Sequence, residues 1–121
     1  MGKKIMLVDD AKVVLLKLSR LLLAAGFEIA AIAVTGTDGI ELYKKHLPDL
    51  VIMDISLPDM EGTKAVKEII EFDPEARIII CTYLAKKETV IEAVSAGARN
   101  YILKPFDVDK IIEVVSVVIN S

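Results

Sequence analysis

Acidic side chains follow two apolar runs of the sequence, at the point where each run ends. Asp9 and Asp10 come directly after Ile5–Val8, and Asp54 comes directly after Leu50–Met53. Two adjacent carboxylates repel each other and cost stability unless a cation compensates them. Carboxylate oxygens suit Mg²⁺, which usually keeps several of its waters. The sequence therefore predicts a divalent-metal site, provided that the fold brings the two segments together.

A hydroxyl group and an ammonium group occupy the same kind of position. Thr82 follows Ile78–Cys81, and Lys104 follows Tyr101–Leu103. Any one of these residues alone is explained as a polar residue where a strand meets solvent. Acids, a hydroxyl and a lysine together form the apparatus that stabilises a transferring phosphoryl group. One carboxylate can itself be the acceptor, and Asp54 is the candidate because it stands alone on its strand.

The elements that must position these residues alternate regularly along the chain. Continuous apolar runs, typical of strands covered on both faces, alternate with segments of helical length. The predicted strands are Ile5–Val8, Ile29–Val34, Leu50–Met53, Ile78–Cys81 and Tyr101–Leu103. The predicted helices are Ala11–Ala25, Thr37–His46, Glu61–Phe72, Lys86–Ala96 and Val108–Asn120. Gly26 and Gly97 are predicted to end helices, and Asp107 to cap the start of the last one.

Five β-α units in succession predict an α/β fold, a doubly wound, flavodoxin-like parallel sheet of five strands with five helices. Parallel strands need crossover connections, and those are almost always right-handed. In such sheets ligands bind beyond the carboxyl ends of the strands, where the strand order reverses. If the order is 2-1-3-4-5, the first and third strands are neighbours and the three carboxylates meet. Residues 1–121 are predicted to form one domain.

Composition argues against several classes of function. The net charge is −3, the 15 basic residues are scattered, and there are three Phe, three Tyr and no Trp, which argues against a nucleic-acid surface. Cys81 is the one cysteine, which fits a reducing compartment, and we expect it in the core rather than acting as a nucleophile. His46 is expected at the surface. With no secretory signal or bilayer-spanning stretch, we expect a cytoplasmic protein without membrane contact.

The chain resembles the receiver domain of two-component response regulators along essentially its whole length. The resemblance rests on the phrases LVDDA, PDLVIMDISLPDMEG, IIICTYLA and AVSAGARNYILKPF and on their spacing. The sequence is most similar to short chemotaxis-type or sporulation-type receivers, and the chemotaxis members have the order 2-1-3-4-5. The resemblance implies a phosphoacceptor signalling domain, with self-catalysed phosphoryl transfer and slow autodephosphorylation, rather than a conventional enzyme. It implies a sensor histidine kinase or histidine phosphotransfer protein as donor, a downstream target protein or effector domain, and a monomer or weak dimer.

The resemblance also implies a phosphoacceptor and a metal site. Asp54 would take the phosphoryl group. Asp10 and Asp54 would supply carboxylate oxygens to Mg²⁺, with Asp9 acting directly or through water. The backbone carbonyl of Ser56 would be a further protein ligand, which leaves its side chain free to vary.

Four further roles follow from the same resemblance. Lys104 would contact the phosphoryl oxygens, and its bond to Pro105 would be cis. Thr82 and Tyr101 would form the switch, with the tyrosine rotating inward as the threonine moves toward the phosphoryl group. Tyr83 departs from the family, which commonly has Ala or Gly there. We expect its ring to act as a gate that slows access to the acceptor, unless the ring swings into solvent or packs beside Tyr101.

The first helix carries more apolar residues than one face can bury. A core spacing is followed by Val14, Leu18, Leu21, Leu22 and Ala25. A second face carries Val13, Leu16 and Leu23. Either loops cover this second face, or it is a docking strip for the helices of the phosphodonor, as the first helix serves in the resembled family.

Three other interpretations share part of this pattern. A flavodoxin-like flavin protein would need a phosphate loop after the first strand, where Asp9 and Asp10 repel phosphate. A haloacid-dehalogenase-type phosphatase would need Asp-x-Asp there, which the sequence lacks. A phosphate-independent, receiver-like interaction module would usually lack an acid, the threonine or the lysine, and all of them are present. The phosphoaccepting receiver is therefore the favoured interpretation.

Overall fold

The computed structural model describes residues 2–83 and 87–121, and the predicted strands and helices form in the predicted order. The strands are β1 (Lys4–Val8), β2 (Glu28–Ala33), β3 (Leu50–Asp54), β4 (Ile78–Thr82) and β5 (Asn100–Leu103). The helices are α1 (Lys12–Ala24), α2 (Gly36–His46), α3 (Gly62–Phe72), α4 (Lys87–Ala96) and α5 (Val108–Ile119). Every predicted boundary among the described residues lies within one residue of the observed boundary. Lys86, predicted to begin the fourth helix, lies outside the described residues, as do Leu84 and Ala85 of the phrase IIICTYLA.

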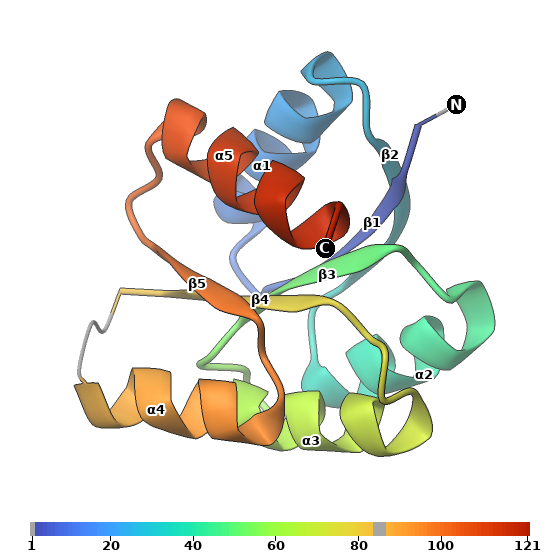
Figure 1. Ribbon diagram of the computed structural model, residues 1–121, viewed down its shortest axis with the longest axis vertical. Helices are drawn as coiled ribbons and strands as arrows, with labels where there is room; N and C mark the ends of the chain where they lie inside the picture. The colour runs from blue at the N-terminus through green and yellow to red at the C-terminus, as the bar shows by residue number, and fades with distance from the viewer. Residues whose placement is uncertain (1, 84–86) are drawn as a thin grey trace.

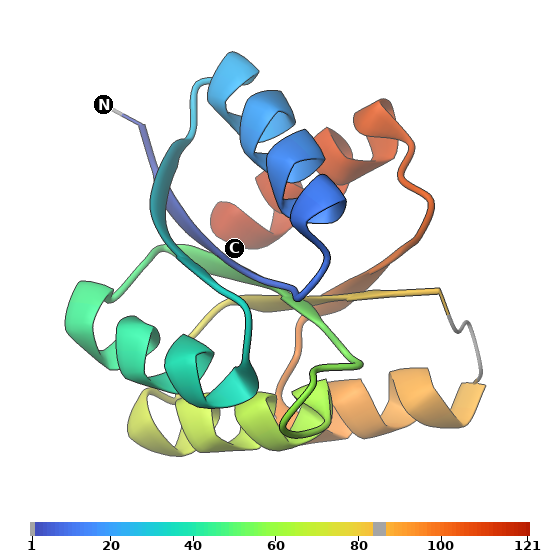
Figure 2. The same cartoon turned by 180° about the vertical axis from the view of Figure 1, so that it is seen from behind.

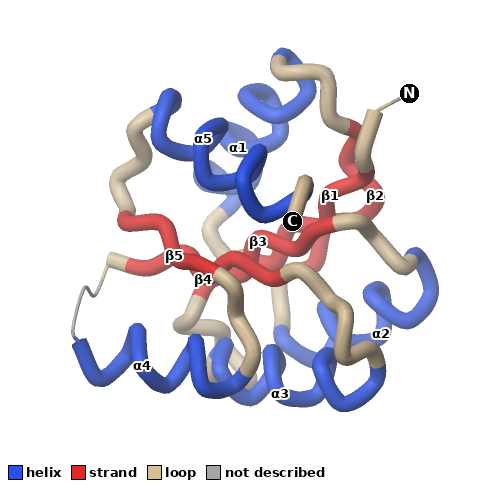
Figure 3. Tube along the Cα trace, viewed as in Figure 1, coloured by secondary structure: helices blue, strands red, loops and turns tan. Residues whose placement is uncertain are grey.

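The strands form one parallel sheet in the order β2-β1-β3-β4-β5, as predicted. The chain first steps from β1 outward to β2 and then reverses toward β3, β4 and β5. Because crossovers between parallel strands are almost always right-handed, such a reversal moves the connecting helices to the other face of the sheet. Figures 1 and 2 show α1 and α5 on one face and α2, α3 and α4 on the other, with the strands as the middle layer in Figure 3.

Side chains of the central strands alternate between two hydrophobic cores. On β1, Met6 and Val8 belong to the core beneath α2, α3 and α4, whereas Ile5 and Leu7 belong to the core beneath α1 and α5. Both sets are at most 1% exposed, which explains why the sequence of this strand is apolar at every position rather than at every second one.

The edge strands differ from the expectation that every strand is covered on both faces. Ile32 of β2 is 46% exposed and Leu103 of β5 is 45% exposed. Each edge strand has a neighbour on one side only, and the helices cover the middle of the sheet more fully than its margins (Figure 1). An apolar run alone does not distinguish a central strand from an edge strand.

The local signals at helix ends are confirmed. Gly26 and Gly97 have φ angles of +94° and +120°, a region that glycine adopts without steric cost. The Asp107 side chain accepts a hydrogen bond from the backbone N–H of Asp109 at 3.0 Å and so caps α5.

The core face of α1 is rotated slightly from the predicted one. Leu15 is buried together with Leu18 and Leu22, whereas Ala25 is exposed just after the helix ends. Positions 15, 18 and 22 keep the spacing of one helical face, and α5 lies on the same side of the sheet as this face (Figure 2). The prediction that Ala25 belongs to the core was therefore wrong, and Leu15 is buried in the core instead.

Candidate functional site

The three carboxylates predicted to bind a metal meet at the carboxyl edge of the sheet. Asp9 and Asp10 follow β1, Asp54 ends β3, and Val8 pairs directly with Met53 in the two adjacent strands. Each of the three acids offers an oxygen within 4.8 Å of the others, with Asp9 and Asp54 buried and Asp10 exposed. This is an oxygen-rich cluster with one side open to solvent, the ligand set that a hard divalent cation requires.

Lys104 extends from the end of β5 into this cluster. Its Nζ lies 2.7 Å from Oδ2 of Asp9 and 3.6 Å from Oδ1 of Asp54. Burial by itself would lower the pKa of Lys104, but the hydrogen bond with Asp9 and the negative charges of Asp54 and Asp9 outweigh it and raise that pKa. The ammonium group is therefore held in its charged form between two buried carboxylates.

The negative charge of Asp54 is poorly compensated, although Lys104 lies nearby. Burial, followed by the charge of Asp9, raises the pKa of Asp54, against the opposing effects of Lys104 and the backbone N–H of Ser56. That N–H donates to Oδ1 of Asp54 at 3.3 Å, a long hydrogen bond. An ionised Asp54 thus costs free energy here, and an added cation would relieve that cost.

Ser56 follows β3, and Thr82 ends the adjacent strand β4. Ser56 is exposed in the loop after β3, and its backbone N–H donates the hydrogen bond to Asp54. Thr82 ends β4 and is buried, and its backbone carbonyl accepts a hydrogen bond from the N–H of Lys104 at 2.9 Å. The peptide bond between Lys104 and Pro105 is cis, as the resemblance implied.

Comparisons with known proteins agree with this geometry. The profile of the response regulator receiver domain family matches residues 5–116. The chemotaxis protein CheY of Bacillus subtilis (strain 168) is 42% identical over 120 residues, which are 99% of this chain and 100% of that protein. The chain is a response regulator receiver domain.

Solved structures place the receiver among close relatives in fold. A LuxR-family two-component response regulator from Aurantimonas has a TM-score of 0.94 at 30% identity, over 99% of this chain and 86% of that one. A chain of the CheX-CheY-BeF3-Mg+2 complex from Borrelia burgdorferi has a TM-score of 0.91 at 33% identity, over 95% of this chain and 88% of that one. Receiver domains are signalling domains rather than conventional enzymes.

The two tyrosines predicted to modulate the receiver are both at its surface. Tyr101, the predicted switch, is 39% exposed on β5. Tyr83, the predicted gate, is 68% exposed, yet its ring centroid lies 5.3 Å from Nζ of Lys104. This distance is within the range of a cation–π contact. The ring therefore lies over the site lysine, an arrangement that the sequence alone did not suggest.

A small cavity of about 140 Å³ leads from the surface to this lysine. Its walls include Tyr83, Lys104 and Phe106 on one side and Val13 and Lys17 of α1 on the other. The apolar face of α1 thus begins beside Lys104 and the carboxylate edge of the sheet. Val13, Leu16 and Leu23 are 79%, 53% and 55% exposed, so the expected second apolar face is present and open to solvent.

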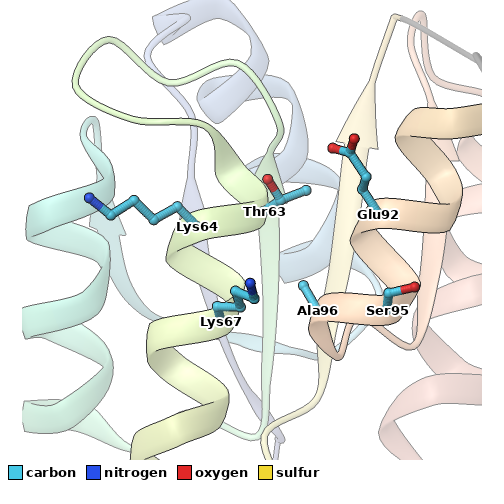
Figure 4. Close-up of a pocket in the computed structure, with 6 residues that line it drawn as sticks. All are labelled: Thr63, Lys64, Lys67, Glu92, Ser95 and Ala96. Atoms are coloured by element: carbon cyan, nitrogen blue, oxygen red, sulfur yellow. The ribbon is translucent and has the colours of Figure 1, made fainter.

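A larger hollow of about 490 Å³ lies elsewhere, between α3 and α4 (Figure 4). It is lined by Thr63, Lys64, Lys67, Glu92, Ser95 and Ala96. None of the described residues at the carboxylate edge lines it. The hollow is therefore separate from the carboxylate cluster.

The remaining sequence expectations concern residues outside the site. Cys81 is buried in the core, as expected, and burial raises the pKa of its thiol to about 12. His46 is exposed, as expected. No helix in the described ranges 2–83 and 87–121 is long and apolar enough to cross a bilayer.

Proposed function

We propose that this receiver takes a phosphoryl group onto Asp54 from a phosphohistidine of a sensor kinase or a histidine phosphotransfer protein. A carboxylate oxygen of Asp54 attacks phosphorus and forms the P–O bond of an acyl phosphate. The P–N bond to the donor breaks, and its electron pair stays on the imidazole, which leaves as the neutral ring when its other nitrogen carries a proton. Attack by water later returns phosphate and the free carboxylate.

The observation that carries the proposal is the position of one ammonium group among three carboxylates. Nζ of Lys104 is 3.6 Å from the Asp54 oxygen, so positive charge already lies where phosphoryl oxygens on Asp54 would need it. Asp9, Asp10, Asp54 and the carbonyl of Ser56 would hold Mg²⁺. The ion would supply further charge stabilisation for the transferring group.

We propose that Thr82 and Tyr101 pass the modification on to the surface. Cys81 of β4 pairs in register with Asp54 of β3. Thr82 is the next residue of β4, so it lies one position beyond the residue that pairs with Asp54. The N–H of Lys104 and the carbonyl of Thr82 link the ends of β4 and β5. A movement of Thr82 toward the phosphoryl group would therefore also displace β5. Tyr101 of β5 is partly exposed, and in the proposed switch its ring rotates inward.

The exposed face of α1 is the proposed docking strip for the phosphodonor. Val13, Leu16 and Val108 line a shallow, largely apolar hollow of about 500 Å³, and Lys17 and Arg20 lie at the same hollow. An apolar strip beside two basic residues suits a helix with an apolar face and acidic flanks. The test uses a phosphorylated kinase that labels the wild type. Leu16→Glu should slow phosphoryl transfer from that kinase by about tenfold. Labelling by acetyl phosphate should stay unchanged, and equal loss of both would indicate misfolding instead.

The test of the proposed reaction is labelling with acetyl phosphate. Wild type with Mg²⁺ should gain one phosphoryl group by intact mass, and reductive trapping followed by peptide mapping should place it on Asp54. Labelling should stop in EDTA. Wild type that remains unmodified with Mg²⁺ would support the alternative, a phosphate-independent interaction module.

A further inference from the structure

The loop between β3 and α3 is closed at its base. The N–H of Gly62 donates to the carbonyl of Ile55 at 2.6 Å, and Ser56 and Glu61 form an isolated antiparallel bridge. The N–H of Ser56 also donates to Asp54. These contacts tie the start of the loop to the carboxylate cluster, but they leave its tip to be held by something else.

The tip is fastened to the first turn of α2 by Asp59. Its Oδ1 accepts from the N–H of Gly36 at 2.8 Å, and its Oδ2 accepts from the N–H and the hydroxyl of Thr37 at 3.0 and 2.7 Å. The first N–H groups of a helix have no partner within the helix and favour a negative charge. The helix's own cap, Thr35, covers only the N–H of Asp38, so Asp59 takes two amides that would otherwise lack a partner.

The next residue, Met60, seats the same tip against α2. A Cβ at Gly36 would overlap Cγ and Sδ of Met60, so a side chain at position 36 would displace the Met60 side chain from its place against α2. Met60 is partly buried and packs on the core beneath α2, α3 and α4. Two consecutive residues of the loop therefore rest on one helical turn, one by hydrogen bonds and one by packing.

We propose that Asp59 is a positioning residue for the metal site. By fastening the loop tip to α2, it fixes the backbone of Ser56, whose carbonyl is a proposed ligand, although Asp59 itself touches no ligand. A loop held at its tip as well as at its base loses less conformational entropy when an ion binds. This inference rests on the proposed Mg²⁺ site, and it predicts that affinity for Mg²⁺ depends on Asp59.

The test compares Mg²⁺ affinity in Asp59→Ala, Asp59→Asn and a matched control, using the backbone amide shift of Ser56 in an NMR titration with MgCl2. Asp59→Ala should raise the Kd for Mg²⁺ about tenfold, the lower end of the effect expected for groups that orient metal ligands. Asp59→Asn loses the same charge but keeps one of the two acceptor oxygens, so it should recover part of the affinity, to within about fivefold of wild type. Glu61→Gln removes a charge from the same loop. The Glu61 side chain makes no hydrogen bond among the described residues, so the Kd of this variant should stay within about twofold of wild type.

Each outcome separates this inference from the proposed function. Wild type without any Mg²⁺-dependent shift would refute the metal site itself. Wild type that binds Mg²⁺ while Asp59→Ala binds within twofold would overturn the role of Asp59, and so would equal weakening in Asp59→Ala and Glu61→Gln, which would indicate a simple charge effect. If Asp59→Ala does not fold, Thr37→Val removes one of the three donors; it should weaken binding about threefold, and unchanged binding would overturn the inference.

Discussion

The carboxylates of Asp54, at the end of β3, and of Asp59, in the loop that follows, have opposite environments. Asp54, at the base, is buried beside Asp9 and accepts one long backbone hydrogen bond among the described contacts, and its pKa is raised. Asp59, at the tip, is exposed, accepts three hydrogen bonds from α2, and has its pKa lowered to about 2, chiefly by the hydroxyl and the N–H of Thr37. The negative charge of Asp54 is poorly compensated, whereas that of Asp59 is compensated by three hydrogen bonds within the protein.

The difference indicates which carboxylate is available for chemistry. A carboxylate whose lone pairs are filled by fixed donors is stable and a poor nucleophile or ligand. A carboxylate that lacks such donors gains free energy when a cation or a phosphoryl group arrives. The distinction does not come from residue type, since both are aspartates five positions apart in the printed sequence.

The largest expected difference between Asp54→Asn and Asp59→Asn is in the extent of labelling by acetyl phosphate. The first removes the nucleophilic oxygen, so labelling should fall to background. The second leaves the acceptor in place, so labelling at saturating Mg²⁺ should stay within about twofold of wild type. Intact-mass time courses measure both. Persistent labelling of Asp54→Asn would mean that the acceptor is another residue.

A several-fold effect is expected at the other rim of the site, where Tyr83 lies over Lys104. Tyr83→Ala should open the path to Asp54 and speed both labelling by acetyl phosphate and loss of phosphate by about fivefold, or about 1 kcal/mol of barrier. Tyr83→Phe keeps the ring and serves as the control, with rates close to wild type. If both rates of Tyr83→Ala stay within twofold, Tyr83 is not a gate.

The melting temperature without metal should move in opposite directions at the two ends of the loop. In EDTA at neutral pH, Asp54→Asn relieves buried repulsion and should raise Tm by about 4 °C, whereas Asp59→Ala leaves helix amides without partners and should lower it by a similar amount. Asp10→Asn should also raise Tm in EDTA.

The increase in Tm that Mg²⁺ causes should be smaller in Asp54→Asn and in Asp10→Asn than in the wild type. Calorimetry measures these shifts, and a Tm change of the same sign at Asp54 and Asp59 would break the comparison.

The smallest effect is the pH dependence of those two stability changes. Because the folded-state pKa of Asp54 is raised, its ionisation opposes folding, so the gain in Asp54→Asn should be largest at neutral pH and shrink as the pH falls through that pKa. Because the pKa of Asp59 is lowered to about 2, its contribution is present above the ordinary carboxyl pKa and is lost only as the pH falls toward 2. Urea unfolding of the metal-free variants across the acid range measures both. A deficit in Asp59→Ala that vanished well above pH 4 would contradict the assigned hydrogen bonds.

The sequence by itself determined the elements and most of the polar residues that meet at the carboxyl edge of the sheet. Apolar runs, glycines with positive φ and a capping aspartate are local signals, so the boundaries came out within one residue. Asp9, Asp10, Asp54, Thr82 and Lys104 were identifiable because parallel strands deliver their carboxyl ends to one edge. The chemistry predicted for this edge rests on the residue types and on the resemblance to receiver domains.

Only the tertiary structure decided how the charges are paired. Lys104 bonds to Asp9 across 95 residues, and Asp59 caps α2 from 22 and 23 residues away. The sequence carries no periodic signal for either contact, since Asp59 stands in a loop and reads as an ordinary turn residue. Likewise, the burial of Leu15 in place of Ala25 depends on how α1 is rotated against the sheet. Local patterns record which face of an element is apolar, but which distant groups meet depends on how the elements cross, and that is decided by packing the whole chain.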